Sequence, residues 1–486
     1  MGNPIEGLEP KSLWNYFYEI SQIPRASKKE EQIREYVKNF AVKNSFGFTE
    51  DEVGNIVIKV PAKEGYENSD FVVLQGHLDM VCEKNKDTEH NFDKDPIKMI
   101  RKGDWMAAEG TTLGADNGIG IAAALSIVTD EDVVHGPIEI LCTIDEETGM
   151  TGVNALGEDS IKGRKLVNMD SEEDGVFYIG CAGGQDTVGV FNIKTTANKK
   201  DLVPYELRIT GLKGGHSGLD IHIGRANAIK IIGTILSKLE PVKFRLASIT
   251  GGSKRNAIPR EAEATVLIPK NKVKKAEKII KESLGDFLTE YQEKDGGLEI
   301  VFSKKSKKVK TVFTKKFTRR IIKTILALPH GVIAMNPSIS GLVNTSTNLA
   351  TVSVIKESIV IGTSQRSSLE SAKNNISNTV KSIFGLARAN SISVGDGYPG
   401  WKPNLDSELL KLSQNVYERL LGKRAEMKAI HAGLECGIFS KKYPGIDMVS
   451  FGPTITGAHS PDEQVNIEDV NKFYTLLKEI IKEAAL

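Results

Sequence analysis

The 486-residue sequence has few cysteines, and those it has are isolated from one another. Cys82, Cys142, Cys181 and Cys436 form no C-x-x-C pair of the kind found in zinc knuckles. Nor do they approach the density of a disulfide-linked secreted domain. This usage indicates a reducing compartment, and we predict a cytoplasmic protein.

Long apolar runs and an excess of one charge are also missing. No uninterrupted apolar run reaches the roughly 18 residues of a membrane span, and the first residues lack the charged and apolar regions of an export signal. Lys and Arg total 64 against 63 Asp and Glu, a formal net charge of +1, which argues against a nucleic-acid partner. The basic run at Lys304–Lys310 is interpreted as a solvated face, with a polyanion patch as the alternative.

What the sequence does contain is typical of a globular protein of more than one domain. It is 40% hydrophobic and 26% charged, and it is longer than the roughly 250–300 residues that one core supports. The residue pattern changes near Gly184 and again at a turn-rich stretch near Gly395. These changes predict three segments, 1–184, 185–394 and 395–486. We expect the first and last segments to build one domain around a second domain formed by the middle segment.

Residue periodicity predicts an α/β first segment and an α+β middle segment. Apolar residues at helical spacing predict two helices within Lys11–Lys43, interrupted by Pro24, and a buried helix over Ile119–Val128 after a glycine-rich loop. The predicted strands of the first and last segments are Asn55–Val60, Phe71–Gln75, Pro137–Ile144, Lys165–Val167 and Met448–Phe451. In the middle segment, polar and apolar residues alternate over Tyr205–Thr210 and Glu261–Ile268, and a predicted helix at Ala226–Leu239 lies between these two stretches. The last segment also holds a predicted helix at Ser407–Leu421.

Polar residues gather directly after the predicted strands of the first segment. His77 and Asp79 follow one strand, and residues two apart in extended chain face the same side, so the carboxylate can orient the imidazole. Glu146 and Glu147 lie in an acidic cluster after another strand, and such a cluster can be relieved by a cation. Each of these signals also has an ordinary explanation as packing or solvated loop residues.

Three further residues extend this series. Asp116 stands on a glycine-rich turn before the buried helix, where an isolated Asp is most often an N-cap. Asp170 follows a short strand, and His459 lies far away in the last segment. Imidazole and carboxylate are the ligands of catalytic zinc, whereas a closed structural site usually contains cysteine. Taken together, the series favours a catalytic metal site.

Eight segments carry a resemblance to a known family over nearly the whole chain. They are GHLDMVCEKN, GTTLGADNGIGIA, DEETGMTG, NMDSEEDG, KGGHSG, GGSKRNAIP, HAGLECGIF and GAHSPDE, in this order. The sequence resembles the di-zinc exopeptidases of the aminoacylase and carboxypeptidase G superfamily, and within it the branch that cleaves Xaa-His dipeptides. The resemblance implies a zinc-exopeptidase-like α/β catalytic domain, with a mixed sheet flanked by helices, and an inserted α+β lid domain.

The resemblance also implies roles for the polar residues. It makes Asp116 a bridge between two divalent metal ions, with His77 and Asp170 completing one shell and Glu147 and His459 the other. Zn²⁺ is the expected metal, with Mn²⁺ or Co²⁺ as alternatives. By the same resemblance, Asp79 would orient His77, and Glu146 would be the general base that takes a proton from the water attacking the peptide carbonyl.

Four more residues are predicted to bind substrate. In the wider superfamily the histidine at the position of His216 stabilises the oxyanion, often in the active site of a partner subunit, which makes a homodimer through the lid domain an expectation. Asn256 and Arg366 match substrate-binding positions, and Arg366 could hold a carboxylate. Glu435, in HAGLECG, is predicted to receive the free amino group of the substrate.

The function predicted from these features is a di-metal dipeptidase acting on small unblocked peptides, Xaa-His dipeptides of the carnosine type among them. One alternative is a related tripeptide aminopeptidase or N-acyl amino acid deacylase, which the HAGLECG segment argues against. The other is a non-catalytic binding protein. The presence of both Glu146 and Asp116 argues against it, because such a protein would tolerate their loss.

Overall fold

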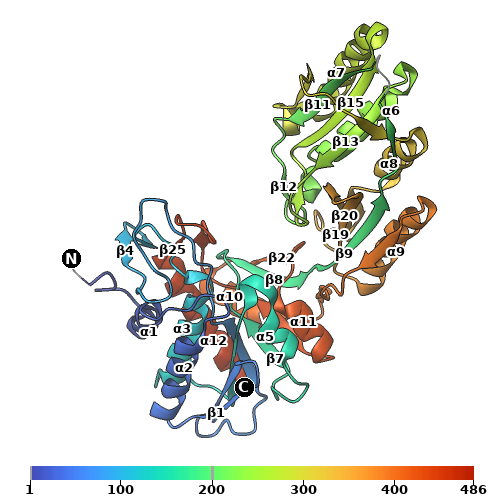
Figure 1. Cartoon of the computed structure of the whole chain (residues 1–486). Helices are drawn as coiled ribbons and strands as arrows, with labels where there is room; N and C mark the ends of the chain where they lie inside the picture. The colour runs from blue at the N-terminus through green and yellow to red at the C-terminus, as the bar shows by residue number, and fades with distance from the viewer. Residues whose placement is uncertain (1–2, 199–201) are drawn as a thin grey trace. The chain divides into compact units, whose positions relative to one another are not determined.

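The protein is described by a computed structural model that covers residues 3–198 and 202–486 and divides into two compact units. The terminal unit extends to Cys181 and resumes over Trp401–Ala429 and Leu434–Leu486. The inserted unit comprises Ala182–Gly400 and Ile430–Gly433. Figure 1 shows the path of the chain through both units. None of the described helices combines the length and apolar character needed to cross a membrane.

A mixed sheet forms the centre of the terminal unit. Its strand order among the described residues is β1-β2-β6-β3-β7-β23-β8-β22. β3 is parallel to both β6 and β7, and β23 is parallel to β7, whereas β2 runs antiparallel to β6. Bounds are β1 (Gly47–Glu50), β2 (Ile56–Val60), β3 (Val72–His77), β6 (Ile138–Thr143), β7 (Lys165–Asn168), β8 (Val176–Cys181), β22 (Glu426–Ile430) and β23 (Asp447–Ser450). β3 and β6 are buried along their whole length, as parallel strands covered on both faces require.

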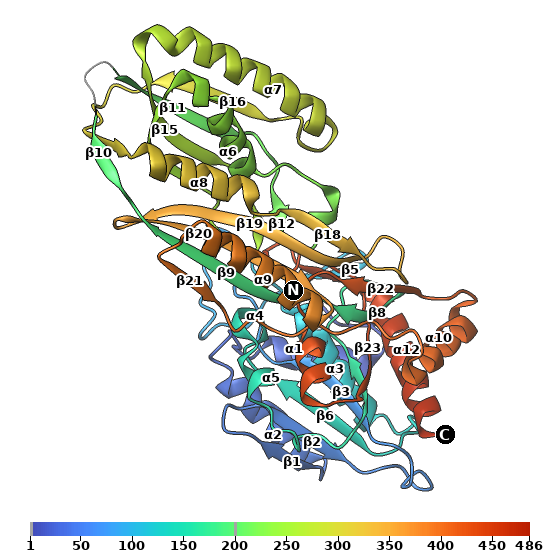
Figure 2. The same cartoon turned by 90° about the vertical axis from the view of Figure 1, so that its right-hand side faces the viewer.

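Helices pack on this sheet, and a small second sheet lies beside it. α3 contacts β3 and α1 (Figure 2), and α11 contacts β8 and α5 (Figure 1). The helices are α1 (Lys11–Ser21), α2 (Glu31–Lys43), α3 (Ala115–Thr129), α4 (Glu146–Gly149), α5 (Thr151–Ala155), α10 (Glu408–Leu421), α11 (Glu435–Lys442) and α12 (Ile467–Ala485). The small sheet has the order β24 (Ile455–Thr456), β25 (Gln464–Asn466), β5 (Trp105–Ala108) and β4 (Met99–Lys102).

The inserted unit is built on a predominantly antiparallel sheet covered by helices. Its sheet order among the described residues is β16-β11-β15-β13-β19-β20-β9-β21, with β18 also paired to β19. The strands are β9 (Gly183–Asn192), β10 (Thr195–Ala197), β11 (Leu202–Thr210), β12 (Gly215–His216), β13 (Arg245–Gly251), β14 (Ala257–Ile258), β15 (Ala262–Pro269), β16 (Glu299–Lys304), β17 (Thr311–Phe313), β18 (Gly331–Met335), β19 (Val343–Ile355), β20 (Ser358–Ser367) and β21 (Ser391–Val394). The helices are η1 (Ile221–Ile223), α6 (Ala228–Lys238), η2 (Glu240–Val242), η3 (Lys270–Lys272), α7 (Val273–Asp295), α8 (Lys315–Ala327) and α9 (Glu370–Leu386).

One apolar core joins this sheet to its helices. Ile229, Ile232 and Ile235 of α6 are almost fully buried against strand residues such as Val266. Their spacing of three residues places them on one face of the helix. Burial of a side chain of this size contributes about 1.5–3 kcal/mol, so this face fixes α6 on the sheet.

The α/β and α+β character predicted for the two parts of the chain is confirmed. The predicted helices near the N-terminus correspond to α1 and α2, and the predicted strands of the first segment correspond to β2, β3, β6 and β7. Several boundaries differ by one to three residues, and the start of α3 differs by four. The structure begins α3 at Ala115, although Asp116 and Asn117 inside it have non-helical backbone angles. The glycine-rich loop therefore ends earlier than expected, and Asp116 lies in an irregular first turn.

Candidate metal centre and active site

The parallel strands bring three predicted site segments to one edge of the sheet. His77 is the last residue of β3 and pairs with Thr143, the last residue of β6. Glu146 follows β6 after two residues, and Asp170 follows β7 after one. Since the carboxyl ends of neighbouring parallel strands meet at the same edge, these side chains converge there.

His459 reaches this edge through the small sheet. It occupies the loop between β24 and β25, and β25 pairs with β5, which leads into the segment before Asp116. His459 itself has φ 62°, so the loop turns sharply at the imidazole. A residue 343 positions after Asp116 is thereby brought within reach of it.

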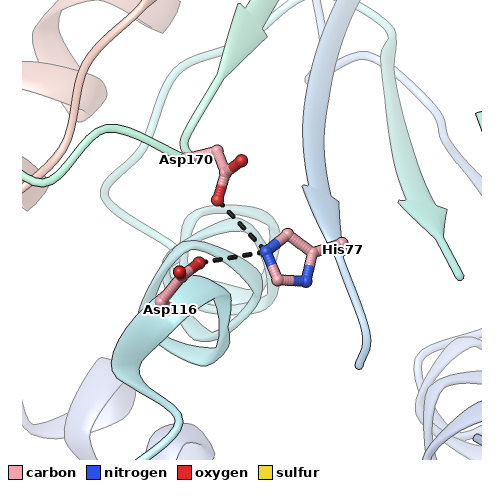
Figure 3. Close-up of side chains that lie close together, drawn as sticks. All are labelled: His77, Asp116 and Asp170. Atoms are coloured by element: carbon pink, nitrogen blue, oxygen red, sulfur yellow. Dashed lines mark hydrogen bonds and ion pairs between the residues drawn. The ribbon is translucent and has the colours of Figure 1, made fainter. Parts of the chain in front are cut away.

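Asp116 lies between the two histidines. Its Oδ1 is 3.0 Å from Nε2 of His77, and its Oδ2 is 3.3 Å from Nε2 of His459. Nε2 of His77 is also 3.2 Å from Oδ1 of Asp170, as Figure 3 shows. On the other side, Nε2 of His459 is 3.0 Å from Oε2 of Glu147. The two oxygens of the Asp116 carboxylate thus face two different imidazoles.

Asp79 is fully buried behind this arrangement and holds two segments together. Its Oδ1 lies 3.4 Å from Nδ1 of His77 and accepts a hydrogen bond from the backbone N–H of Glu146 at 3.1 Å. Its Oδ2 accepts from the N–H of Glu147 at 3.2 Å and from the hydroxyl of Ser27 at 2.7 Å. Burial alone would raise the pKa of Asp79, but the hydrogen bonds with His77 and these donors lower it to about 2. Asp79 therefore stays ionised, and its backbone carbonyl lies 3.1 Å from Nδ1 of His77.

The charges of the cluster perturb one another strongly. Hydrogen bonds to Asp116 and Glu147 raise the pKa of His459 to about 11. Burial works against the charged form of His77, yet Asp170 and Asp116 raise its pKa well above the usual value. Burial and neighbouring carboxylates raise the pKa of both Asp170 and Glu146. The site therefore concentrates negative charge that positive charge must balance.

The donor atoms form three groups that could each hold a metal ion: two share Asp116, and the third consists of His77, Glu146 and Glu147. His77, Asp116 and Asp170 offer ligand atoms that all lie within 4.8 Å of one another, and so do Asp116, Glu147 and His459. Asp116 is common to both sets, which are the two ligand sets that the resemblance implied. Oε1 of Glu147 is buried and has no hydrogen-bond partner within the described part of the chain. An unpaired buried carboxylate oxygen is costly, and a cation would satisfy it.

Glu435 lies in the same unit, buried under the strand ends. It is the first residue of α11, and its Oε2 accepts hydrogen bonds from Nε2 of Gln75 at 2.5 Å and from the hydroxyl of Thr143 at 2.9 Å. Its Oε1 is buried without a hydrogen-bond partner among the described residues. Burial raises the pKa of Glu435 to about 7, and its charge in turn helps to raise the pKa of Glu146. A cationic group would relieve this carboxylate.

The other three predicted substrate-binding residues belong to the inserted unit. His216 and Asn256 line the same cavity of about 660 Å³. Nδ1 of His216 accepts hydrogen bonds from the N–H groups of Gly218 and Leu219, so Nε2 carries the proton of the neutral ring. Burial and then the charge of Arg366 lower the pKa of His216. Arg366 is buried in β20 and donates to the hydroxyl of Tyr398 at 2.8 Å.

Sequence reasoning missed several residues that support the site. Gln75 and Thr143 hold Glu435, Ser27 holds Asp79, and buried Arg25 and Glu463 bind the backbone of loops that carry ligands. Gln75 and Thr143 carried a usable signal, because both are polar residues at or near the carboxyl ends of buried strands. For Arg25 and Glu463 no periodicity or spacing points to partners so distant in the sequence.

Comparison with known proteins places the chain in a family. The model of peptidase family M20/M25/M40 matches residues 73–483. A relative from Escherichia coli (strain K12), the cytosol non-specific dipeptidase, is 43% identical over 480 residues, which are 99% of each chain. Together with the fold and the site, these matches define a peptidase: the chain belongs to peptidase family M20/M25/M40.

Solved structures agree with this assignment. The aminoacylhistidine dipeptidase from Vibrio alginolyticus superposes with a TM-score of 0.92 at 40% identity, covering 99% of this chain and 98% of that one. An aminopeptidase from Bacillus cereus superposes with a TM-score of 0.58 at 16% identity, over 99% of this chain and all of the other. The second similarity shows the shared fold alone.

Proposed function

We propose that the protein is a di-metal dipeptidase that hydrolyses unblocked dipeptides, Xaa-His dipeptides among them. The observation that carries the proposal is the placement of Asp116 between His77 and His459, with Asp170 and Glu147 as the outer carboxylates. Two relatives at 43% and 40% identity over nearly the whole chain bear dipeptidase names, one non-specific and one for aminoacylhistidine substrates. This supports a broad dipeptide specificity rather than that of a tripeptidase or a deacylase.

The metal set consists of two divalent cations, and we favour Zn²⁺ over Mn²⁺ and Co²⁺. His77, Asp116 and Asp170 would hold the first, and Asp116, Glu147 and His459 would hold the second. Nitrogen and oxygen donors without cysteine are typical of catalytic zinc sites, although Mn²⁺ and Co²⁺ accept the same donors. When bound, such a pair polarises a carbonyl and lowers the pKa of a water molecule toward about 7.

Glu146 is the proton carrier in the proposed reaction. Its backbone N–H is fixed by Asp79, and its ligand atom lies within 4.8 Å of those of His77 and Glu147. Burial raises its pKa above the ordinary value for a glutamate, and a carboxylate beside the attacking water can accept a proton and return it. Glu146 takes a proton from the attacking water and delivers it to the amine that leaves.

The remaining residues recognise the two ends of the dipeptide. The unpaired Oε1 of Glu435 supports its role as acceptor of the substrate ammonium group. In the inserted unit, the resemblance assigns Arg366 to the substrate carboxylate, Asn256 to substrate binding and Nε2–H of His216 to the oxyanion, and His216 and Asn256 line one cavity of that unit. The terminal unit is thus the catalytic domain, and the inserted unit is the domain of substrate contacts.

A homodimer through the inserted unit is part of the proposal. β18 pairs with β19 and exposes Val332, Ile333 and Met335 at 37%, 47% and 48%. An exposed apolar strand favours pairing with another chain. Light scattering after size-exclusion chromatography tests this, and a monomeric active enzyme would contradict it. A cytoplasmic location, without nucleic acid or membrane as partner, is supported by the four free cysteines and the net charge of +1.

The test of the function is a substrate panel combined with metal analysis. We expect two metal ions per chain and cleavage of Xaa-His and other free dipeptides, lost on chelation and regained with Zn²⁺. The panel also holds tripeptides and N-acyl amino acids at equal concentration. Faster cleavage of tripeptides or of N-blocked substrates than of dipeptides would refute the proposal, as would activity that survives complete metal removal.

A further inference from the structure

The buried carboxylate of Glu463 binds four consecutive backbone amides. Its Oε2 accepts hydrogen bonds from the N–H groups of Leu113 at 2.8 Å and Gly114 at 3.0 Å. Its Oε1 accepts from Ala115 at 2.8 Å and Asp116 at 3.3 Å. Glu463 is only 2% exposed and lies four residues after His459. One carboxylate therefore connects the loop of His459 to the turn that carries Asp116.

Arg25 makes the opposite kind of contact on the same turn. Its Nη1 donates to the backbone carbonyls of Leu78 at 3.0 Å and Asp79 at 2.9 Å, and its Nη2 donates to the carbonyl of Gly114. The guanidinium is 2% exposed. It joins the segment that follows His77 to the turn before Asp116, and its positive charge lies near the negative charge of Glu463.

Two glycines of the sequence motif leave room for this guanidinium. A Cβ on Gly114 would lie 2.5 Å from Nη2 of Arg25, and one on Gly118 would lie 2.7 Å from it. Gly114 also has φ 71°, a conformation that favours glycine. The glycine pattern around Asp116 is therefore explained by the approach of Arg25 as well as by the turn itself.

Three ligand segments meet at these two side chains. His77, Asp116 and His459 come from different parts of the chain, and the carboxylates around them repel one another. Burying Glu463 and Arg25 is expensive unless their charges are fully hydrogen-bonded, and the backbone groups supply most of those bonds. Neither side chain belongs to a ligand set, so their contacts act on the metal only through the position of the ligands.

We propose that Glu463 and Arg25 are positioning residues that hold the His77, Asp116 and His459 segments at the separation that two metal ions require. This rests on the proposed metal centre. Partners that orient metal ligands typically account for about 10- to 100-fold in metal affinity or activity. Substitution of Glu463 is a more specific test than substitution of Arg25, because the carboxylate of Glu463 contacts backbone amides and belongs to no ligand set.

The test compares Glu463→Gln with Asp462→Asn. The Gln side chain keeps the shape but loses the charge and directs an NH₂ group at backbone donors, whereas Asp462 is exposed and carries the same charge one position earlier. Zinc affinity is measured by competition with a chromogenic chelator, alongside kcat and KM for a free dipeptide. We expect Glu463→Gln to bind zinc at least tenfold more weakly and to lose kcat with KM within twofold. Excess zinc restores part of kcat, and Asp462→Asn matches the wild type.

A purely structural role predicts a different pattern. It would lower the melting temperature of Glu463→Gln and leave the zinc affinity and kcat of the folded protein unchanged, which would overturn the proposal. If Glu463→Gln does not fold, Glu463→Asp decides, since its carboxylate is one methylene short of the amides: tenfold weaker zinc binding supports the proposal, and wild-type affinity refutes it. Wild-type protein that binds no metal would instead refute the metal centre itself.

Discussion

The substitution Glu435→Gln tests two separate effects of this buried carboxylate. One is its effect on the free energy of unfolding, and the other is its proposed binding of the substrate ammonium group. Burial raises the pKa of Glu435 from 4.5 to about 7 in the metal-free protein. Since the folded state then binds the proton more tightly than the unfolded state, the stabilisation from this group is complete below about pH 4.5 and is lost as the pH rises through about 7. A difference of about 2.5 pKa units corresponds to roughly 3 kcal/mol.

The Gln variant avoids this loss because it stays neutral. Its amide oxygen can still accept from Gln75 and Thr143, as Oε2 of Glu435 does. We therefore expect the unfolding free energy of metal-free Glu435→Gln, relative to the wild type, to increase by about 3 kcal/mol between pH 4.5 and pH 8. Urea unfolding at both pH values, followed by far-UV circular dichroism, measures the change. Glu408→Gln is the control, since Glu408 is exposed at the first position of α10 and should show a difference within about 0.5 kcal/mol.

Activity gives the second half of the test. A charged hydrogen bond to the substrate ammonium contributes about 1.5–3 kcal/mol, so Glu435→Gln should lower kcat/KM for free dipeptides by roughly 10- to 100-fold. A relative stability that does not change with pH would refute the buried-charge reasoning. Unchanged kcat/KM in a variant that gains stability would leave the electrostatics intact and remove Glu435 from substrate recognition.

Three further outcomes are expected. Glu146→Gln should keep both metal ions by elemental analysis and lose all but about a hundredth of kcat, and faster turnover would exclude Glu146 as the base. Chelation should abolish hydrolysis and lower the melting temperature measured by calorimetry, because the cluster then lacks its balancing charge; a melting temperature that does not recover with added Zn²⁺ would contradict this. Asn227→Ala should cost about 1–2 kcal/mol in urea unfolding, because the buried Asn227 caps α6 through the N–H groups of Ile229 and Lys230 and donates to the carbonyl of Leu349; a loss below about 0.3 kcal/mol would show that the cap is replaceable.

Local sequence predicted the elements that have a strong local cause. Runs such as Val72–His77 and Ile138–Thr143 are dense in branched apolar residues, and both form fully buried strands. The start of α3 was misjudged because the turn around Asp116 is shaped by Arg25 and Glu463, whose contacts lie 89 and 348 residues away along the chain at Gly114 and Ala115.

The long elements of the inserted unit were also missed. α7 spans Val273–Asp295, but its mixed apolar and charged residues give a weaker periodic signal than those of α6. β19 and β20 carry many polar residues that are buried, among them Thr347, Thr363 and Gln365. Gln365 donates to the hydroxyl of Thr347 on the neighbouring strand and to that of Thr363 on its own strand, so buried polar side chains are satisfied and a polar pattern hides a buried strand.

The reactive groups of this protein, two histidines and several acids in an order that resembles a peptidase family, can be recognised along the chain. Which of these groups meet depends on the tertiary structure. Asp116 faces both His77 and His459, which lie 39 and 343 residues away, because parallel strands share an edge and a small sheet returns the end of the chain to it. Gln75 and Glu435 meet across 360 residues in the same way. Such contacts depend on how the sheets pack. Because packing imposes no fixed separation along the chain between the residues that meet, the sequence pattern does not predict these contacts.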